Sequence, residues 1–118
     1  MGKRPRTTAR PQSPPQRQTS NTMAAPVLSD IEIQRALGRL PGWSRRANVI
    51  TKTFTAPTFP AGIAFIRRIA DAAEAAQHHP DIDIRYTKLT IALSTHDSGG
   101  LTQKDIDLAG AIEGLFSA

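Results

Sequence analysis

All the histidines of this 118-residue chain lie in one short stretch, from His78 to His96. The stretch is preceded by Glu74, which stands four residues before the adjacent pair His78 and His79 in the letters E-A-A-Q-H-H-P. The third histidine, His96, follows in the letters S-T-H-D, and Asp105 comes nine residues later. Histidine has an unperturbed pKa of about 6.5, so it can donate and accept protons near neutral pH. Three histidines gathered in this way, with none elsewhere, indicate a site for proton-transfer chemistry.

Two alternating segments predict how these histidines come together. Residues 81–86 and 88–94 both alternate polar and apolar side chains, which is typical of half-buried β-strands. Because almost nothing separates the two segments, a tight antiparallel hairpin is the simplest connection. His79 and His96 are equidistant from a turn at residues 87–88. We therefore expect them to lie side by side, with His78 at the same end of the sheet.

Apolar spacing predicts three helices around these strands. The first should begin after Ser29, which forms a capping-box pair with Glu32 in the first turn. The second should begin after Thr58 and end before Pro80, and the third covers residues 102–116. The residues expected on the buried faces are Ile31, Leu37 and Leu40 in the first helix, Phe59, Ile63, Ile66, Ala70 and Ala73 in the second, and Ile106, Ala109, Ile112 and Phe116 in the third.

A second hairpin completes the predicted elements. Residues 43–46 and 49–54 predict two strands joined around Ala47 and Asn48. The resulting order, α-β-β-α-β-β-α, indicates the α+β class: a four-stranded antiparallel sheet with helices packed on one face. Trp43 is the single tryptophan, and we expect it to anchor the core.

Composition limits the function classes. The length fits one small domain. The chain has no cysteine, which excludes a disulfide framework and a thiolate metal site and fits a reducing, cytoplasmic location. No apolar run approaches the roughly 20 residues of a membrane span, and no signal-peptide region is present.

The net charge of +5 belongs to the beginning of the chain. Residues 1–29 hold five basic residues and no acidic one, whereas the other ten lysines and arginines balance ten acidic residues. A neutral domain argues against nucleic-acid binding by the folded part. The first residues are rich in Pro, Gln, Ser and Thr, so we expect residues 1–25 to be disordered and dispensable, and residues 26–118 to form the domain. The alternatives are a transit peptide, a nucleic-acid-binding arm, or a true start at Met23.

The spacing of the chemical residues resembles a known family. The pattern is E-x-x-x-H-H-P, five residues, Tyr86, nine residues, His96, eight residues and Asp105. This resembles the signature of the pterin-4a-carbinolamine dehydratases, also called 4a-hydroxytetrahydrobiopterin dehydratases. The resemblance extends to L-P-G-W at residues 40–43 and to G-L-T-Q-K-D-I-D-L-A, and it covers residues 29–116.

The resemblance implies which residues form the site. The catalytic residues would be His78, His79 and His96. The substrate contacts would come from the same histidines and from Gln77, Ser94, Thr95 and Asp97. Glu74 would orient a histidine. Asp105 stands at the third position after Thr102, where an acid caps a helix, so we favour a supporting, structural role for it.

The resemblance also implies a reaction, the dehydration of 4a-hydroxytetrahydrobiopterin to quinonoid dihydropterin and water in tetrahydrobiopterin recycling. Losing water from a carbinolamine requires an acid for the hydroxyl and a base for the ring N–H, and it requires no metal or cofactor. Our interpretation is that His78 and His96 protonate the departing hydroxyl while His79 holds the pterin near N5 and acts as the base.

Two alternatives come from other classes. Three histidines with Asp81, Asp97 or Glu74 could bind zinc or iron(II), although adjacent histidines on an extended chain point in different directions. The second alternative is a protein-binding module that uses helix faces, since some members of the family are dimerisation partners of other proteins. The apolar face of residues 102–116 could form such an interface or a homodimer contact, and we expect a homodimer or homotetramer.

Overall fold

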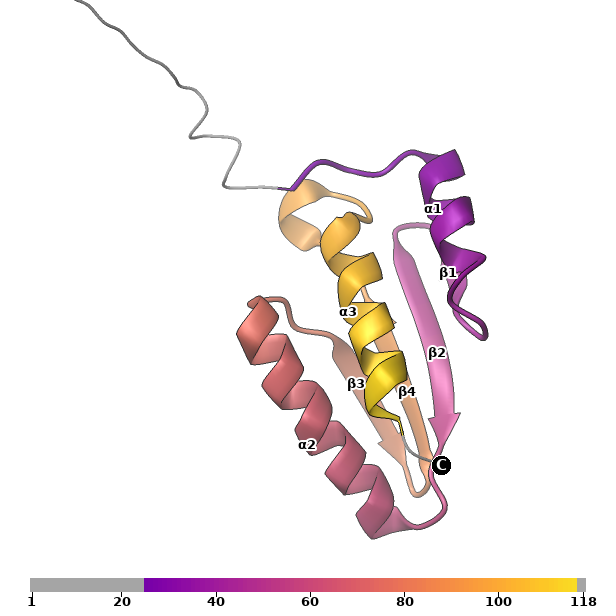
Figure 1. Ribbon diagram of the computed structural model, residues 1–118, viewed down its shortest axis with the longest axis vertical. Coiled ribbons are helices and arrows are strands. Elements are labelled where there is room, and N and C mark those ends of the chain that lie inside the picture. The colour runs from indigo at the N-terminus through magenta and orange to yellow at the C-terminus, as the bar shows by residue number, and fades with distance from the viewer. Residues whose placement is uncertain (1–24, 117–118) are drawn as a thin grey trace, which may run out of the picture.

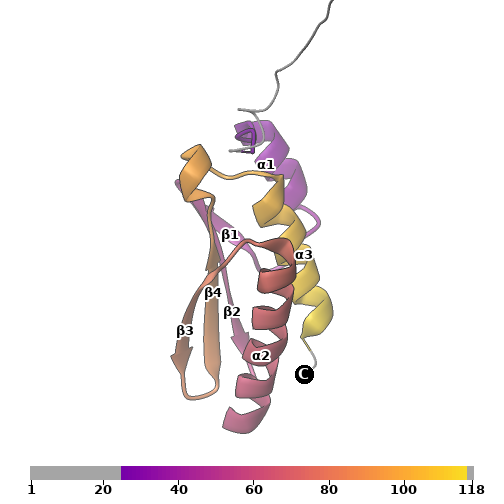
Figure 2. The ribbon, with the colours of Figure 1, turned by 90° about the vertical axis from the view of Figure 1, so that its left-hand side faces the viewer.

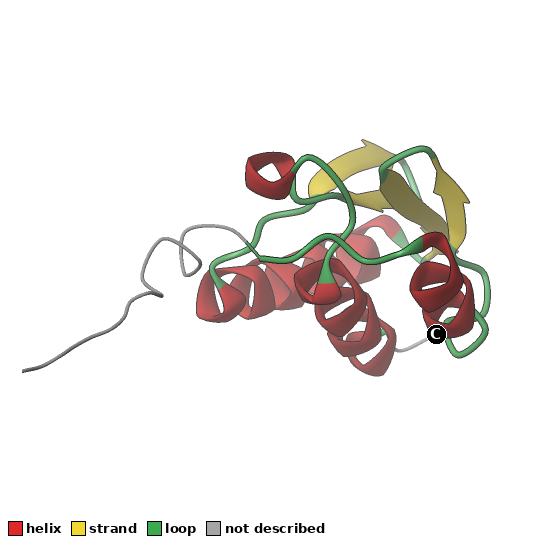
Figure 3. Ribbon diagram, turned by 90° about the horizontal axis from the view of Figure 1, so that it is seen from above, coloured by secondary structure: helices red, strands yellow, loops and turns green. Residues whose placement is uncertain are grey.

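Two β-hairpins and three α-helices make up residues 25–116, the part of the chain that a computed structural model describes. The elements are α1 (Asp30–Leu37), β1 (Ser44–Arg46), β2 (Val49–Thr55), α2 (Phe59–Ala76), β3 (Asp81–Arg85), β4 (Lys88–Leu93) and α3 (Gln103–Leu115), with a short 3-10 helix, η4 (His96–Ser98), before α3. The strands form one antiparallel sheet in the order β1-β2-β4-β3. All three α-helices lie against the same face of this sheet (Figures 1, 2 and 3). The expected element order and the α+β class are confirmed.

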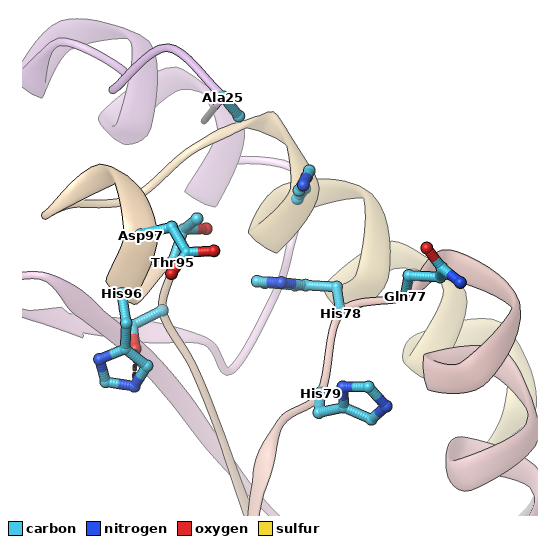
Figure 4. Close-up of a pocket in the computed structure, with 9 residues that line it drawn as sticks. Ala25, Gln77, His78, His79, Thr95, His96 and Asp97 are labelled. Carbon is cyan, nitrogen blue, oxygen red and sulfur yellow. Dashed lines mark hydrogen bonds between the residues drawn. The ribbon is translucent and has the colours of Figure 1, made fainter. Parts of the chain in front are cut away.

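The hairpin of β3 and β4 turns one residue earlier than expected. Arg85 pairs with Lys88, so Tyr86 and Thr87 form the loop, and Tyr86 takes a positive φ of 56°. Continued past the strand ends, this register brings His79 opposite Ser94 and not opposite His96. The chain leaves the sheet after Leu93 and coils into η4, which places His96 beyond the strand. The expectation that the histidines share one end of the sheet is still met (Figure 4).

The buried faces of α1 and α2 differ in part from the expected ones: Leu40 and Ala73 are buried as expected, but most of the other expected residues are not. In α1 the buried residues are Ile33 and Ala36, while Ile31 is 61% exposed. In α2 they are Gly62, Phe65, Ile69 and Ala73, while Phe59 and Ile63 are 44% and 42% exposed. Both helices carry more apolar residues than one face can bury, so close approach to the sheet selects the face. A Cβ at Gly62 would lie 3.4 Å from the Ala56 Cβ and 3.5 Å from the Leu89 side chain, so this position of α2 is in ordinary van der Waals contact with the residue after β2 and with β4.

The apolar face of α3 packs against the core of the domain. Ala109 and Ile112 are fully buried, as expected, and they lie beside Leu108 and Asp105. The apolar face of residues 102–116 is therefore not available as an interface, which corrects that part of the prediction. Trp43 is buried as expected, and its Nε1 donates a hydrogen bond of 2.8 Å to Glu113 Oε2.

Capping boxes fix the starts of α1 and α3. Ser29 Oγ accepts from the Glu32 N–H, and Glu32 Oε1 accepts from the Ser29 N–H. The backbone and hydroxyl of Ser29 hold the pKa of the Glu32 carboxyl below its ordinary value, because both hydrogen bonds favour the ionised form. The Thr102 N–H likewise donates to Asp105 Oδ2 at 3.0 Å, which confirms the capping role expected for Asp105.

The first described residues pack against the segment between β4 and α3. The Leu28 N–H donates to the Leu101 carbonyl at 2.8 Å, and Val27 forms a bridge with Thr102. Ser98 Oγ donates to the Ala25 carbonyl. Ala25, which we assigned to a dispensable segment, is thus held at the domain; the rest of that segment, residues 1–24, lies outside the described residues. Among the described helices, none is long and apolar enough to cross a membrane.

Candidate active site

The three histidines line one open cavity of about 270 Å³. His78 and His79 come from the connection between α2 and β3, and His96 lies on the other side of the cavity, at η4 (Figure 4). The lining residues are Ala25, Gln77, His78, His79, Ser94, Thr95, His96, Asp97 and Lys104. Every residue predicted to be catalytic or to bind substrate is in this set. The structure therefore brings the predicted site residues together.

The end of α2 directs the histidine pair into the cavity. Gln77 adopts the left-handed conformation, with φ 52° and ψ 43°, and its N–H donates to the Glu74 carbonyl. This conformation ends the helix and turns the chain. The His78 N–H still donates to the Ala73 carbonyl at 3.1 Å, so His78 is fixed to the last turn. Pro80 then prevents any continuation of the helix.

His78 is paired with a buried carboxylate. Its Nε2 lies 2.6 Å from Asp105 Oδ1, and the Asp105 side chain has no exposed surface. The other oxygen, Oδ2, accepts from Thr95 Oγ1 at 2.7 Å and from the Thr102 N–H. With its carboxylate bonded at both oxygens, Asp105 can hold the imidazole of His78 in one orientation, as carboxylates do for catalytic histidines. Asp105 thus combines helix capping with support of a histidine.

The other two histidines are more exposed. His79 Nε2 lies 2.5 Å from Glu74 Oε2, and both side chains are mostly exposed to solvent. This contact is the one expected for Glu74. His96 Nε2 lies 3.5 Å from Ser94 Oγ, a long contact. Glu74 and Asp105 stand behind the histidines and do not line the cavity.

The metal alternative requires convergent ligands. Within residues 25–116, no three side chains of His, Cys, Asp or Glu are grouped closely enough to hold one ion. His78 and His79 each direct Nε2 to a different carboxylate, on α3 and on α2. Adjacent histidines thus diverge, as expected for neighbours on an extended chain.

Residues 26–115 match the family model described as Pterin 4 alpha carbinolamine dehydratase. The chain belongs to this family. The names of the family and of its members describe a dehydratase, which is a hydro-lyase, so the resemblance drawn from the spaced histidines, Tyr86 and Asp105 is confirmed at the level of the family.

Relatives that this chain matches over almost their whole length support the same membership. A relative from Roseiflexus sp. (strain RS-1), provisionally named a pterin-4-alpha-carbinolamine dehydratase, is 60% identical over 89 residues, which are 75% of this chain and 96% of the relative. A relative from Nocardia farcinica with the same provisional name is 53% identical over 93 residues, 79% of this chain and 98% of the relative.

Solved structures share the fold. The crystal structure of a transcriptional coactivator/pterin dehydratase from Brucella melitensis matches with a TM-score of 0.75 and 29% identity, over 77% of this chain and 99% of that one. A pterin dehydratase-like protein identified as a RuBisCO assembly factor in the alpha-carboxysome matches with a TM-score of 0.52 and 20% identity, over 62% of this chain and 84% of that one. The second likeness concerns the fold alone.

Two residues of this family member's cavity escaped the sequence prediction. Lys104 reaches the cavity from the first turn of α3, and Ala25 reaches it from the segment that packs against Ser98. Only the position of Lys104 two residues after the capping Thr102 could have indicated from the sequence that its side chain lies near the site. Ala25 carried no signal, because alanine offers no group that chemistry would select.

Proposed function

We propose that this chain catalyses the dehydration of 4a-hydroxytetrahydrobiopterin to quinonoid dihydropterin and water, as a step in tetrahydrobiopterin recycling. One observation carries the proposal: three histidines line a single cavity, and two of them are bonded through Nε2 to carboxylates. The substrate class follows from the family. The absence of cysteine fits a cytoplasmic location, which we propose as well.

The proposed reaction is a balanced proton exchange. The bond between C4a and the hydroxyl oxygen breaks, and the hydroxyl leaves as water after it accepts a proton. The N5–H proton passes to a base, and its electron pair forms the C4a–N5 double bond. The step transfers only protons between the substrate and the protein, so a positioned acid and a positioned base are the groups that the protein must provide.

The hydrogen bonds suggest which nitrogen each histidine offers. His78 and His79 direct Nε2 to carboxylates, which leaves Nδ1 of each ring for the substrate. A neutral His79 with its proton on Nε2 would present an unprotonated Nδ1 to N5–H and act as the base. A protonated His78, balanced by Asp105, would donate from Nδ1 to the departing hydroxyl, with His96 acting on the same group.

The polar residues beside the histidines would orient the pterin. Gln77, Ser94 and Asp97 line the cavity and offer amide, hydroxyl and carboxylate groups to the edges of the ring. Thr95 also lines the cavity, but its hydroxyl is bonded to Asp105. We therefore assign substrate contact to the first three and a different role to Thr95.

The test is dehydration of the carbinolamine by the purified chain after chelator treatment, measured against buffer because the uncatalysed reaction is appreciable. We expect the treated protein to accelerate dehydration and added zinc or iron(II) to change the rate little. A protein that is inactive until metal is restored would contradict the acid–base mechanism and favour the metal alternative.

We also propose self-association, as a homodimer or homotetramer. Exposed apolar side chains gather where the start of α2 meets the end of β3: Phe59 and Ile63 on the helix, Ile84 and Tyr86 on the strand side. The rings of Phe59 and Tyr86 are stacked, with centroids 6.5 Å apart. An exposed apolar cluster of this kind is typical of an interaction surface. A protein partner at this cluster is the alternative to a second copy of the chain.

A further inference from the structure

Thr102 is fully buried and does not line the cavity, yet hydrogen bonds connect it to His78. Its Oγ1 lies 2.9 Å from Thr95 Oγ1, and Thr95 Oγ1 lies 2.7 Å from Asp105 Oδ2. The other oxygen of Asp105 lies 2.6 Å from His78 Nε2. The two threonines and the carboxylate thus form a continuous buried path to a histidine of the proposed site.

The donors and acceptors along this path have only one consistent arrangement. An ionised carboxylate can only accept, so Thr95 must give its hydroxyl hydrogen to Asp105. The Thr95 oxygen is then left as the acceptor for the hydroxyl of Thr102. Thr102 in turn accepts from the Lys104 N–H at 3.2 Å. At the far end, His78 donates from Nε2 to Asp105, which leaves Nδ1 without a proton when the ring is neutral.

Helix capping alone does not account for this arrangement. As the N-cap of α3, Thr102 needs only a lone pair for the Lys104 N–H. The cap at Thr58 on α2 works in that way, since its oxygen accepts from the Ala61 N–H at an exposed position. The hydroxyl hydrogen of Thr102 is buried and needs an acceptor of its own, and Thr95 provides it.

We propose that Thr102 and Thr95 are positioning residues for the proposed dehydration: their hydroxyls fix the carboxylate of Asp105, which holds His78 as the Nε2-protonated tautomer with Nδ1 toward the cavity. The inference rests on the proposed function for its kinetic consequences. Its structural part does not depend on the proposed function: His78 carries its proton on Nε2, and that proton exchanges slowly with water.

The first experiment compares Thr102→Val with Thr102→Ser. The valine keeps the shape and removes the hydroxyl, so we expect kcat to fall roughly three- to tenfold, the effect of one hydrogen bond of ordinary strength, with KM within about twofold of wild type. The serine keeps the hydroxyl and should restore kcat to within about twofold. Thr58→Val is the matched control, because it removes the hydroxyl from another helix N-cap without touching the path, and its kcat should equal that of wild type.

The middle link gives a second, independent variant. Thr95→Val removes a bond to a charged group, so kcat should fall by about ten- to a hundredfold, while Thr95→Ser should stay near wild type. The double variant Thr95→Val with Thr102→Val should be no slower than Thr95→Val alone, because both changes act through the same carboxylate. If Thr102→Val fails to fold, the kcat values of Thr95→Val and Thr95→Ser test the proposal by the same comparison.

Nitrogen NMR of the His78 ring tests the positioning role of the two threonines without any assay of activity. In wild type and in Thr102→Ser we expect the neutral ring to carry its proton on Nε2 and to exchange it slowly with water. In Thr102→Val and Thr95→Val the exchange should be faster. Equal exchange rates of the Nε2 proton in all variants, or a kinetic loss confined to KM, would overturn the positioning role of the two threonines. A wild-type protein whose Nε2 proton exchanges slowly but that has no dehydratase activity would overturn the proposed function. It would still support the path of hydrogen bonds from Thr102 to His78.

Discussion

At the scale of single residues, Asp105 connects the architecture to the chemistry. One carboxylate oxygen caps α3 through the Thr102 N–H, and the other is bonded to His78. A fully buried carboxylate is costly unless hydrogen bonds satisfy it, and here His78, Thr95 and Thr102 together do so. This gives the same residue a role in stability and a role in the orientation of the histidine.

The substitution Asp105→Asn should separate these two roles. The amide oxygen must stay at the Oδ2 position, because Thr95 and the Thr102 N–H both donate there. The amide nitrogen then faces His78 Nε2 and forces the imidazole into the other tautomer. We expect kcat to fall by roughly a hundred- to ten-thousandfold with little change in urea unfolding. Asp107→Asn, at an exposed bond with Gln103 on the same helix, is the control, and comparable activity in both variants would refute the assigned tautomer.

Residue types, spacing and the family resemblance were enough to predict most of the lining and the contact of Glu74 with His79, but not the partner of His78. The three histidines could be recognised because no other residues of their type exist in the chain. The pairing of His78 with Asp105 depends on how α3 packs, which spacing along the chain does not contain. Thr102 looked like an ordinary cap, and only its burial against Thr95 shows that its hydroxyl has a second partner.

At the scale of elements, caps and alternation predicted where helices and strands begin and which face α3 buries, whereas the expected buried faces of α1 and α2 were largely wrong. The capping pairs at Ser29 and Thr102 and the Ala47–Asn48 turn all lie where expected. The buried face of α1 does not, because Ile31 and Ile33 both suit an apolar stripe and only tertiary packing chooses between them. In α2, packing selects the face that carries Gly62, Phe65 and Ile69.

The orientation of α1 is testable with two variants two residues apart. Ile33 is 2% exposed and Ile31 is 61% exposed. We expect Ile33→Ala to lower the free energy of unfolding by about 2–5 kcal/mol, the range for removing a buried isoleucine. Ile31→Ala should change it by less than about 1 kcal/mol. Urea unfolding curves at equal protein concentration would reveal the opposite order if α1 were turned as the sequence pattern first indicated.

At the scale of the whole molecule, the described domain and the basic beginning of the chain are distinct in charge. Ala25, the first residue that the structure describes, is bonded to Ser98 and lines the cavity. We therefore expect removal of residues 1–24 to leave cooperative unfolding and dehydration unchanged. Loss of either in the truncated protein would contradict this division. A salt-sensitive affinity for nucleic acid that disappears with the segment would instead show the predicted alternative of a binding arm.

Self-association also belongs to this scale. Ile63→Lys places a charge in the exposed apolar cluster, and we expect it to shift the protein toward monomer in sedimentation or light scattering. Ile31→Lys introduces the same charge at an exposed isoleucine on α1, away from the cluster (Figure 1), and should leave the oligomeric state unchanged. A wild-type protein that is monomeric at micromolar concentration would refute the proposed homodimer or homotetramer.

The most direct test of the account is the dehydration rate of the carbinolamine with wild-type protein, with His78→Ala, His79→Ala and His96→Ala, and with the double variant of His79 and His96. Each single change should slow the catalysed reaction by roughly ten- to ten-thousandfold over the buffer background. The double variant should lose less than the product of the two singles, because both residues act on one transition state. Unfolding should change little for the exposed His79 and His96, whereas His78→Ala should cost about 1–3 kcal/mol because Asp105 loses a partner. Wild-type activity in any of the three folded single variants would contradict a shared histidine site.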